Sequence, residues 1–187
     1  MGRIVATAFW HRLDTDGHDC CRLVETDEGW QLEGHAVFRH DGMPCGLGYT
    51  VRCDGEWRTR SASVSGGIGH EALGFEIVHG PEGWLLDGRI QNAAAGCIDL
   101  DLGFTPATNL IAIRRLVPKE GVDTFAPAAY YLEFTRALGL IEQIYRRTGG
   151  ERLAYTSATH GYSAELAVHP SGFVPDYPGL WRGEVSA

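Results

Sequence analysis

The sequence predicts an all-β, mainly antiparallel protein: a single-domain, many-stranded β-barrel or a strongly curved sheet built of hairpins, with little helix. Glycine is abundant, with 25 of 187 residues, and it falls where short apolar runs stop. Turn pairs recur at intervals of roughly 8–14 residues, a spacing typical of antiparallel all-β folds. Asp-Gly favours a hairpin because both positions tolerate positive φ. The pairs are Glu28-Gly29, Asp41-Gly42, Asp54-Gly55, Glu82-Gly83, Asp87-Gly88 and Ser171-Gly172.

Length and charge set the class of protein. A chain of 187 residues is most simply one domain, residues 1–187. The net charge of −8 and the lack of a basic stretch argue against a nucleic-acid partner. The start, MGRIVATAFW, lacks the apolar core of a signal peptide, and no run approaches the ~20 apolar residues of a transmembrane segment. Five cysteines without metal-type spacing predict reduced thiols, so a cytoplasmic location is expected.

The first half contains an internal echo. "EGWQLEG" at 28–34 and "EGWLLDG" at 82–88 share the pattern Glu-Gly-Trp-x-Leu-acid-Gly. If each is a strand that follows a turn, its tryptophan and leucine share one face, because side chains alternate along a strand. The echo predicts two similar hairpins.

The stretch "YTVRCDGEWRTRSAS" at 49–63 predicts a further hairpin. A two-residue turn at Asp54-Gly55 pairs Cys53 with Glu56 and places Tyr49 opposite Arg60. One surface of the hairpin then carries an aromatic, an aliphatic and two arginine side chains, and Trp57 and Thr59 face the other side. An aromatic ring beside two guanidinium groups suits an anionic or hydroxylated ligand, and an ordinary exposed charged face is the alternative. The four side chains on that surface are Tyr49, Val51, Arg58 and Arg60.

Two carboxylates lie two positions apart in "GCIDLDLGFTPATNLIAIRRL", residues 96–116. In a strand Asp99 and Asp101 point to the same side, roughly 6.6 Å apart. They are read as ion-pair partners of Arg114 or Arg115 on the next strand, as polar ligand contacts, or as a catalytic or metal site. A metal site needs a third ligand, which the sequence does not name. The ion-pair network is the favoured interpretation.

Residues 105–109, Thr-Pro-Ala-Thr-Asn, predict a turn in which the Thr and Asn side chains bind backbone groups. The stretch 127–147 is ambiguous between helix and strand. Its pieces "AYYLEF" and "EQIYRR" read as strands, but aromatic and aliphatic residues also recur there at helical spacing. No other segment indicates a helix. The residues at helical spacing are Tyr130, Phe134, Leu138, Ile141 and Tyr145.

Local catalytic motifs are missing from the sequence. Gly67-x-Gly69-x-x-Ala72 is followed by the strand-like "LGFEIV" and not by the helix that a dinucleotide site requires. There is no GxSxG, Walker loop, HExxH or full calcium loop. The sequence therefore predicts no catalytic residue, no metal site and no cofactor, and the favoured interpretation is that the chain is not an enzyme.

Four stretches together resemble the bacterial glycolipid-binding domain family: "GWQLEG", "YTVRCDGEWRTR", "GCIDLDLGFTPATNLIAIRRL" and "FVPDYPGLWR". The resemblance covers nearly the whole chain. It implies a many-stranded antiparallel β-barrel akin to lipid-carrying β folds, and it favours strands at 127–147. Ala112 stands where the family has proline. The family's motif residues map onto Trp57, Thr59, Arg60, Asp99, Asp101, Thr105, Pro106, Thr108, Asn109, Arg114, Arg115, Gln143, Tyr145, Asp176 and Tyr177.

The leading hypothesis is non-catalytic binding of an amphipathic lipid or glycolipid in a β-barrel cavity. Burial of an acyl chain contributes about 0.8 kcal/mol per CH₂, and aromatic rings at the mouth can stack on sugars. One alternative is a hydrolase that uses Asp99 and Asp101, and another is a structural or interaction module with a filled barrel. The predicted ligand-binding residues are Tyr49, Trp57, Thr59, Arg60, Asp99, Asp101, Asn109, Arg114, Arg115, Gln143 and Tyr145.

Overall fold

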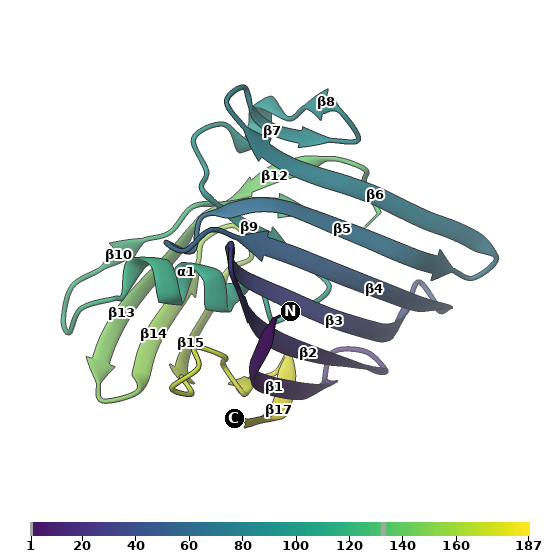
Figure 1. The fold of residues 1–187 in the computed structure, drawn as a ribbon. Helices are drawn as coiled ribbons and strands as arrows, with labels where there is room; N and C mark the ends of the chain where they lie inside the picture. The colour runs from purple at the N-terminus through teal and green to yellow at the C-terminus, as the bar shows by residue number, and fades with distance from the viewer. Residues whose placement is uncertain (1, 132–133) are drawn as a thin grey trace.

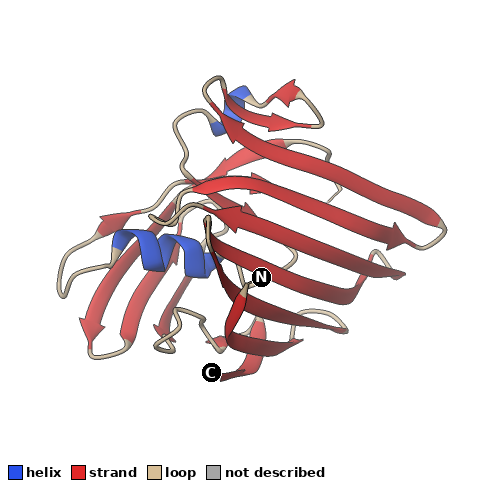
Figure 2. Cartoon of the chain, viewed as in Figure 1, coloured by secondary structure: helices blue, strands red, loops and turns tan. Residues whose placement is uncertain are grey.

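The structure is a computed structural model that describes residues 2–131 and 134–187. Strands dominate it (Figures 1 and 2), which confirms the predicted all-β fold class. The largest sheet has the order β16-β17-β1-β2-β3-β4-β5-β6-β7-β8, and all its neighbours are antiparallel. Its strands are β1 (Arg3–Arg12), β2 (Gly17–Thr26), β3 (Gly29–His40), β4 (Met43–Cys53), β5 (Thr59–Ile68), β6 (Glu71–Gly80), β7 (Gly83–Leu86), β8 (Arg89–Ile90), β16 (Asp176–Tyr177) and β17 (Trp181–Ser186).

The large sheet is curved and open. Among the described residues, its terminal strands β8 and β16 do not pair with each other. The curved-sheet form of the prediction is therefore the one that holds, and the closed barrel is wrong. Consecutive strands β1 to β8 are neighbours in the sheet, which is the arrangement that closely spaced turn pairs predict.

Two smaller sheets and a helix complete the fold. In Figure 1, β13, β14 and β15 lie on the opposite side of the view from the long strands β3 to β6, and Tyr145 of β13 forms a hydrogen bond to Asn109 of α1. The four-stranded sheet is β10 (Thr124–Phe125), β13 (Gln143–Gly149), β14 (Arg152–Ser157) and β15 (Tyr162–Ala167). The three-stranded sheet is β12 (Leu138–Ile141), β11 (Ala128–Tyr131) and β9 (Asp99–Leu102), and its β9–β11 pair is parallel. The helices are η1 (Asn92–Ala94) and α1 (Asn109–Leu116).

Large side chains cover the inner face of the curved sheet. Trp10 and Trp84 are fully buried, and their indole N–H groups donate to the carbonyls of Val174 and Cys97, each at 2.9 Å. Phe75 packs on Tyr131 of β11 with ring centroids 4.4 Å apart. At these positions the protein's own core occupies the space that the barrel prediction reserved for an apolar hollow.

Residues 127–147 form strands β11, β12 and β13, which confirms the strand alternative; residues 132 and 133 of this stretch lie outside the described residues. The prediction that no other segment is helical is wrong, because α1 spans Asn109–Leu116. Four consecutive α1 residues, 110–113, are buried and apolar. The short helix therefore lacks the alternation of apolar and polar residues by which an amphipathic helix is recognised in a sequence. Consequently Arg114 and Arg115 lie on a helix and not on the next strand.

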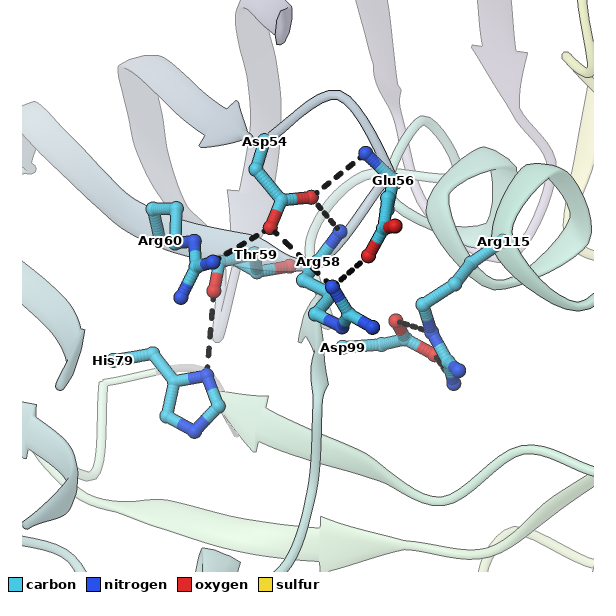
Figure 3. Close-up of polar contacts among 8 residues, drawn as sticks. All are labelled: Asp54, Glu56, Arg58, Thr59, Arg60, His79, Asp99 and Arg115. Carbon is cyan, nitrogen blue, oxygen red and sulfur yellow. Dashed lines mark hydrogen bonds and ion pairs between the residues drawn. The ribbon is translucent and has the colours of Figure 1, made fainter. Parts of the chain in front are cut away.

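The predicted register of the 49–63 hairpin is also wrong. Cys53 pairs with Thr59 and Tyr49 pairs with Val64, so the turn spans residues 54–58 and not two residues. Asp54 causes the longer turn, since its Oδ1 accepts the backbone N–H groups of Glu56 and Arg58, each at 2.9 Å (Figure 3). Tyr49 and Val51 are therefore buried, whereas Arg58 and Arg60 are exposed, and the predicted shared surface does not form.

Strand β9 lies at the edge of its sheet and is buried on both faces. Among the described residues its outer edge has no partner strand, and threonine hydroxyls accept the N–H groups there. The Leu100 N–H donates to Thr59 Oγ1 and the Leu102 N–H donates to Thr108 Oγ1, both at 3.2 Å. Buried backbone N–H groups without such partners are strongly destabilising. The predicted turn at 105–109 is confirmed at the same place, because the Ala107 N–H donates to Thr105 Oγ1 at 3.0 Å.

Replacing these hydroxyls should destabilise the protein. We expect Thr59→Val and Thr108→Val each to lower the free energy of unfolding by about 1–3 kcal/mol, since each leaves one buried N–H unsatisfied and Thr108→Val also removes a donor to Asp101. Urea unfolding followed by circular dichroism measures this. Thr7→Val, at an exposed position of β1, is the matched control and should change stability little. Equal stability of all three variants would show that the hydroxyls do not secure the edge of β9.

Candidate ligand pocket

The predicted site residues do not form one site. Tyr49 belongs to the core, 3% exposed, and its hydroxyl donates to Asp19 Oδ2 at 2.9 Å. Thr105 donates to the same oxygen at 2.5 Å. Asp19 is fully buried, and this burial raises its pKa to about 7 although the two hydroxyls oppose the shift. Tyr49 therefore supports a buried carboxyl and does not face a ligand.

A second group surrounds the Asp54 turn. The Arg60 guanidinium pairs with Asp54 Oδ2 at 2.7 Å, and the buried Thr59 reaches towards β9 (Figure 3). Trp57, the buried residue at the end of the turn, stacks on Trp30 with ring centroids 4.5 Å apart. The Arg114 guanidinium lies over the Trp57 ring, 5.2 Å from its centre. These contacts hold the turn against α1.

A third contact joins Asp99 to Arg115. Two nitrogens of the Arg115 guanidinium donate to the two carboxylate oxygens of Asp99 at 2.7 and 2.8 Å (Figure 3). Asp99 is 1% exposed, and its hydrogen bond raises the pKa of Arg115. The predicted ion pair is thus confirmed for Asp99 with Arg115. Arg114 makes a different contact, a hydrogen bond to the carbonyl of Pro170 at 3.4 Å.

Asp101 has a different environment from Asp99. Its Oδ1 accepts Thr108 Oγ1 at 3.2 Å and its Oδ2 accepts Gln143 Nε2 at 3.4 Å, so both donors are neutral and the second bond is long. Burial raises the pKa of Asp101 to about 6, and these two bonds only partly oppose the shift. Asp101 is a buried carboxyl with weak compensation.

Gln143 connects Asp101 to two tyrosines. Its Oε1 accepts the hydroxyls of Tyr145 and Tyr155 at 3.0 and 3.1 Å. The Tyr145 hydroxyl also lies 2.9 Å from Asn109 Oδ1, at the start of α1. The structure therefore brings four of the predicted site residues together: Asp101, Asn109, Gln143 and Tyr145.

An open pocket of about 420 Å³ lies over this network, where β9 and β11, the pair β14–β15, and the end of β1 with β16 and β17 meet. Asp101 and Asn109 line it, and Gln143 and Tyr145 lie behind them. The aromatic part of the wall comprises Tyr130, Tyr155, Tyr162, Tyr177 and Trp181.

The rings of the wall meet at angles. Tyr155 lies 6.0 Å from Tyr162 with an interplanar angle of 54°, and 6.5 Å from Tyr177 at 86°. The Tyr177 side chain is buried, 4% exposed, and its hydroxyl has no hydrogen-bond partner among the described residues. A buried hydroxyl without a partner is uncommon in folded proteins, and a bound ligand is one way to satisfy it.

Arg12 forms the cationic part of the wall. It donates to Asp14 at 2.8 Å, and its guanidinium carbon lies 5.3 Å from the Trp181 ring centre. Arg12, Asp14, Tyr155, Tyr162 and Trp181 were missed as site residues by reasoning from the sequence. They come from the two chain ends and from β14–β15, and no local motif marks them. The family resemblance marked Thr105, Pro106 and Tyr177, which also line the pocket, and its stretch "FVPDYPGLWR" contains Trp181.

Two further features concern the described part of the chain. No group of three or more His, Cys, Asp or Glu side chains there is arranged to hold a metal ion. Within the same residues, no helix has the length and apolar character needed to cross a membrane.

The fold and the pocket define a small all-β protein in which three sheets enclose an open, aromatic and polar pocket. A family model described as "Putative glycolipid-binding" matches residues 7–183, so the chain belongs to this family. A DUF1089 family protein from Pseudomonas aeruginosa, known from a crystal structure, is similar with a TM-score of 0.76 and 27% identity over 88% of this chain and 91% of that chain. A comparison with curated proteins finds no match.

The Asp99–Arg115 pair generates a stability prediction. Arg115→Met should lower the free energy of unfolding by about 3–5 kcal/mol, because it leaves a buried carboxylate without its cation. Arg146→Met removes an exposed pair, Arg146–Asp123 at 3.5 Å, and should cost about 0–1 kcal/mol. Adding Asp99→Asn to Arg115→Met should recover part of the loss. Chemical unfolding measures all three, and no recovery in the double variant would contradict the stated cause.

Asp19 and Asp101 generate a pH prediction. Their pKa values in the folded protein, about 7 and about 6, lie above those of an unfolded chain, so folding binds protons. Their contribution to stability is present at acidic pH and is lost as pH rises through 6 and 7. Asp19→Asn should flatten this decline between pH 5 and 8, on the order of 1–4 kcal/mol. Urea midpoints across that range test it against exposed Asp27→Asn, which should keep the slope of the native protein.

Proposed function

We propose that this protein binds the polar head of an amphipathic lipid or glycolipid in the pocket beside Asp101, without catalysing a reaction. One observation carries the proposal: Tyr177, whose buried hydroxyl has no hydrogen-bond partner among the described residues, lines an open pocket together with other aromatic rings and the weakly compensated carboxyl of Asp101. The description of the family supports a binding role of this kind.

The chemistry of the wall suits a hydroxylated head group. Tyrosine and tryptophan rings present apolar faces to the C–H groups of a sugar, while their polar edges bind hydroxyls. Asp101 and Asn109 add acceptors and donors at the base of the pocket. Pockets of this type fix a ligand by a few convergent polar groups within an aromatic lining.

The acyl chain needs a different place from the one that the barrel hypothesis gave it. The inner face of the large sheet is filled by core side chains such as Trp10 and Phe75. Leu180 lines the pocket, and its carbonyl accepts the N–H of Leu13, whose side chain is 39% exposed. In the proposed complex the tail lies along these leucines at the mouth, so the head group supplies most of the specificity.

A second candidate function, hydrolysis with Asp101 as a general acid or base, is supported by the raised pKa of Asp101 in an open pocket. Asp99, its supposed partner, is held by Arg115 and does not line this pocket. Chromogenic glycosides and esters assayed with the native protein and with Asp101→Asn separate the two functions. Hydrolysis that Asp101→Asn abolishes would replace the binding proposal.

Binding can be tested with short-chain alkyl glycosides that carry neutral or amino sugars. With protein stripped of lipid, titration should change the tryptophan fluorescence, since Trp181 lies in the wall, and raise the melting temperature. Tyr177→Phe should weaken binding about 3–10-fold without lowering stability, because it removes a hydroxyl that has no hydrogen-bond partner among the residues the structure describes.

Tyr155→Phe is the matched comparison. Its hydroxyl donates to Gln143, so this variant should lose stability as well as affinity. No fluorescence change and no thermal shift with any acyl or glycosyl lipid would reject the proposed function. Unchanged affinity in Tyr177→Phe would move the ligand away from this pocket.

A further inference from the structure

We propose that the head group bound in this pocket carries an ammonium group, either the primary amine of an amino sugar or a quaternary ammonium, held between Asp101 and the tyrosine rings. The inference rests on the proposed function and names its ligand class. It is built on the partners of Asp101, the orientation of the rings and the charges of the wall.

Asp101 is the pocket carboxyl that the protein leaves without a cation. Its two hydrogen bonds come from the neutral side chains of Thr108 and Gln143, and none of the ion pairs among the described residues includes it. Arg115, on the neighbouring helix, is committed to Asp99 by both carboxylate oxygens. A buried carboxylate in this state gains most from a ligand that brings positive charge.

The rings suit a cation better than a flat sugar face alone. Tyr162 and Tyr177 stand at 54° and 86° to Tyr155, so the three planes form neighbouring walls and not a single stacking platform. Aromatic faces attract ammonium groups through the ring quadrupole, and sets of rings on several sides recognise quaternary ammonium ligands. Trp181 already accepts one cation in this way, the Arg12 guanidinium at 5.3 Å.

The charges of the wall favour an ammonium over an anion. Asp14 pairs with Arg12 across a 2.8 Å contact, so among the described charges of the wall Asp101 is the one without a counter-ion. The chain as a whole has a net charge of −8. A phosphate head would meet this carboxylate directly, at a cost of like-charge contact in a poorly solvated place.

Proton linkage makes the inference measurable. Burial raises the pKa of Asp101 to about 6, and an ammonium group favours the ionised carboxylate, so ammonium ligands should bind more tightly at pH 7.5 than at pH 5. His160 also lines the pocket, and histidines commonly change charge in this range, so His160→Gln is included to separate the two. The other titratable or charged side chains around Asp101 are Arg12, Asp14, Asp99, Arg115, Tyr130, Tyr145, Tyr155, Tyr162 and Tyr177.

The experiment uses two matched pairs of probes with the 187-residue chain in isothermal titration calorimetry. Octyl glucosaminide is compared with its N-acetylated form, and octyl choline ether is compared with the neutral octyl 3,3-dimethylbutyl ether. We expect each ammonium probe to bind about 10-fold or more tightly than its neutral partner at pH 7.5, a difference of about 1.4 kcal/mol. The first pair reports a primary amine that donates to Asp101, and the second reports enclosure by the rings.

Variants assign the effect to Asp101. Asp101→Asn should bring the two members of each pair to within about 2-fold, and the native protein at pH 5 should approach the same ratio without any substitution. His160→Gln should retain the pH dependence. Asp123→Asn makes the same change of charge on an exposed residue outside the pocket, and it should keep the native preference.

The outcomes separate this inference from the proposed function. If neutral glycosides bind as tightly as their ammonium partners in the native protein at pH 7.5, the ammonium inference is overturned and glycolipid binding stands. If a preference exists but survives in Asp101→Asn and at pH 5, Asp101 is not its source and the inference is overturned. If none of the four probes binds, both proposals are rejected.

Discussion

Strand β9 is buried on both faces, carries two carboxylates and, within the described part of the chain, has a partner strand along only one edge. Each of these properties is unfavourable unless other groups compensate for it. Thr59 and Thr108 satisfy the N–H groups of the unpaired edge, and the Trp84 indole binds the carbonyl of Cys97 just before the strand. The organisation of the loops around β9 follows from this requirement, because the compensating side chains come from β5, β7 and the turn before α1.

The two carboxylates of β9 connect the scaffold to the pocket. Asp99 binds Arg115 in the last turn of α1, and Asn109 at the first turn of the same helix lines the pocket. The ion pair therefore orients the helix that presents Asn109, and a purely structural contact positions a pocket residue. Asp101 lies two residues further on. Arg115 pairs with Asp99 and not with Asp101, and the hydrogen bonds to Asp101 come from the neutral side chains of Thr108 and Gln143. The two aspartates on one face of β9 therefore differ in their electrostatic environment, because Arg115 forms an ion pair with Asp99 alone.

Local interactions explain which features were predictable from the sequence. Hairpins depend on a few neighbouring residues, so the turn pairs predicted the curved antiparallel sheet well. The register at 49–63 failed for a local reason as well, because the Asp54 carboxylate binds two N–H groups and lengthens the turn. The pocket depends on distant segments: the pairing of β16 with β17 and of β17 with β1 brings Tyr177 against Tyr155 and places Trp181 in the same wall. No periodicity in one sequence reports such a contact, and the family resemblance marked only part of it.

A filled interior changes where binding energy must arise in this fold. A hollow barrel gains affinity from the burial of an acyl chain, which is proportional to apolar area and indifferent to the head group. Here the curved sheet buries its own aromatic side chains, and the open pocket lies where the three sheets meet, with a carboxyl and a hydroxyl that the protein satisfies poorly. Such groups lower the stability of the unliganded protein, and natural proteins retain them mainly where function requires it. A ligand that satisfies them recovers this free energy on binding, so selectivity for the head group and stabilisation by the ligand have the same physical origin.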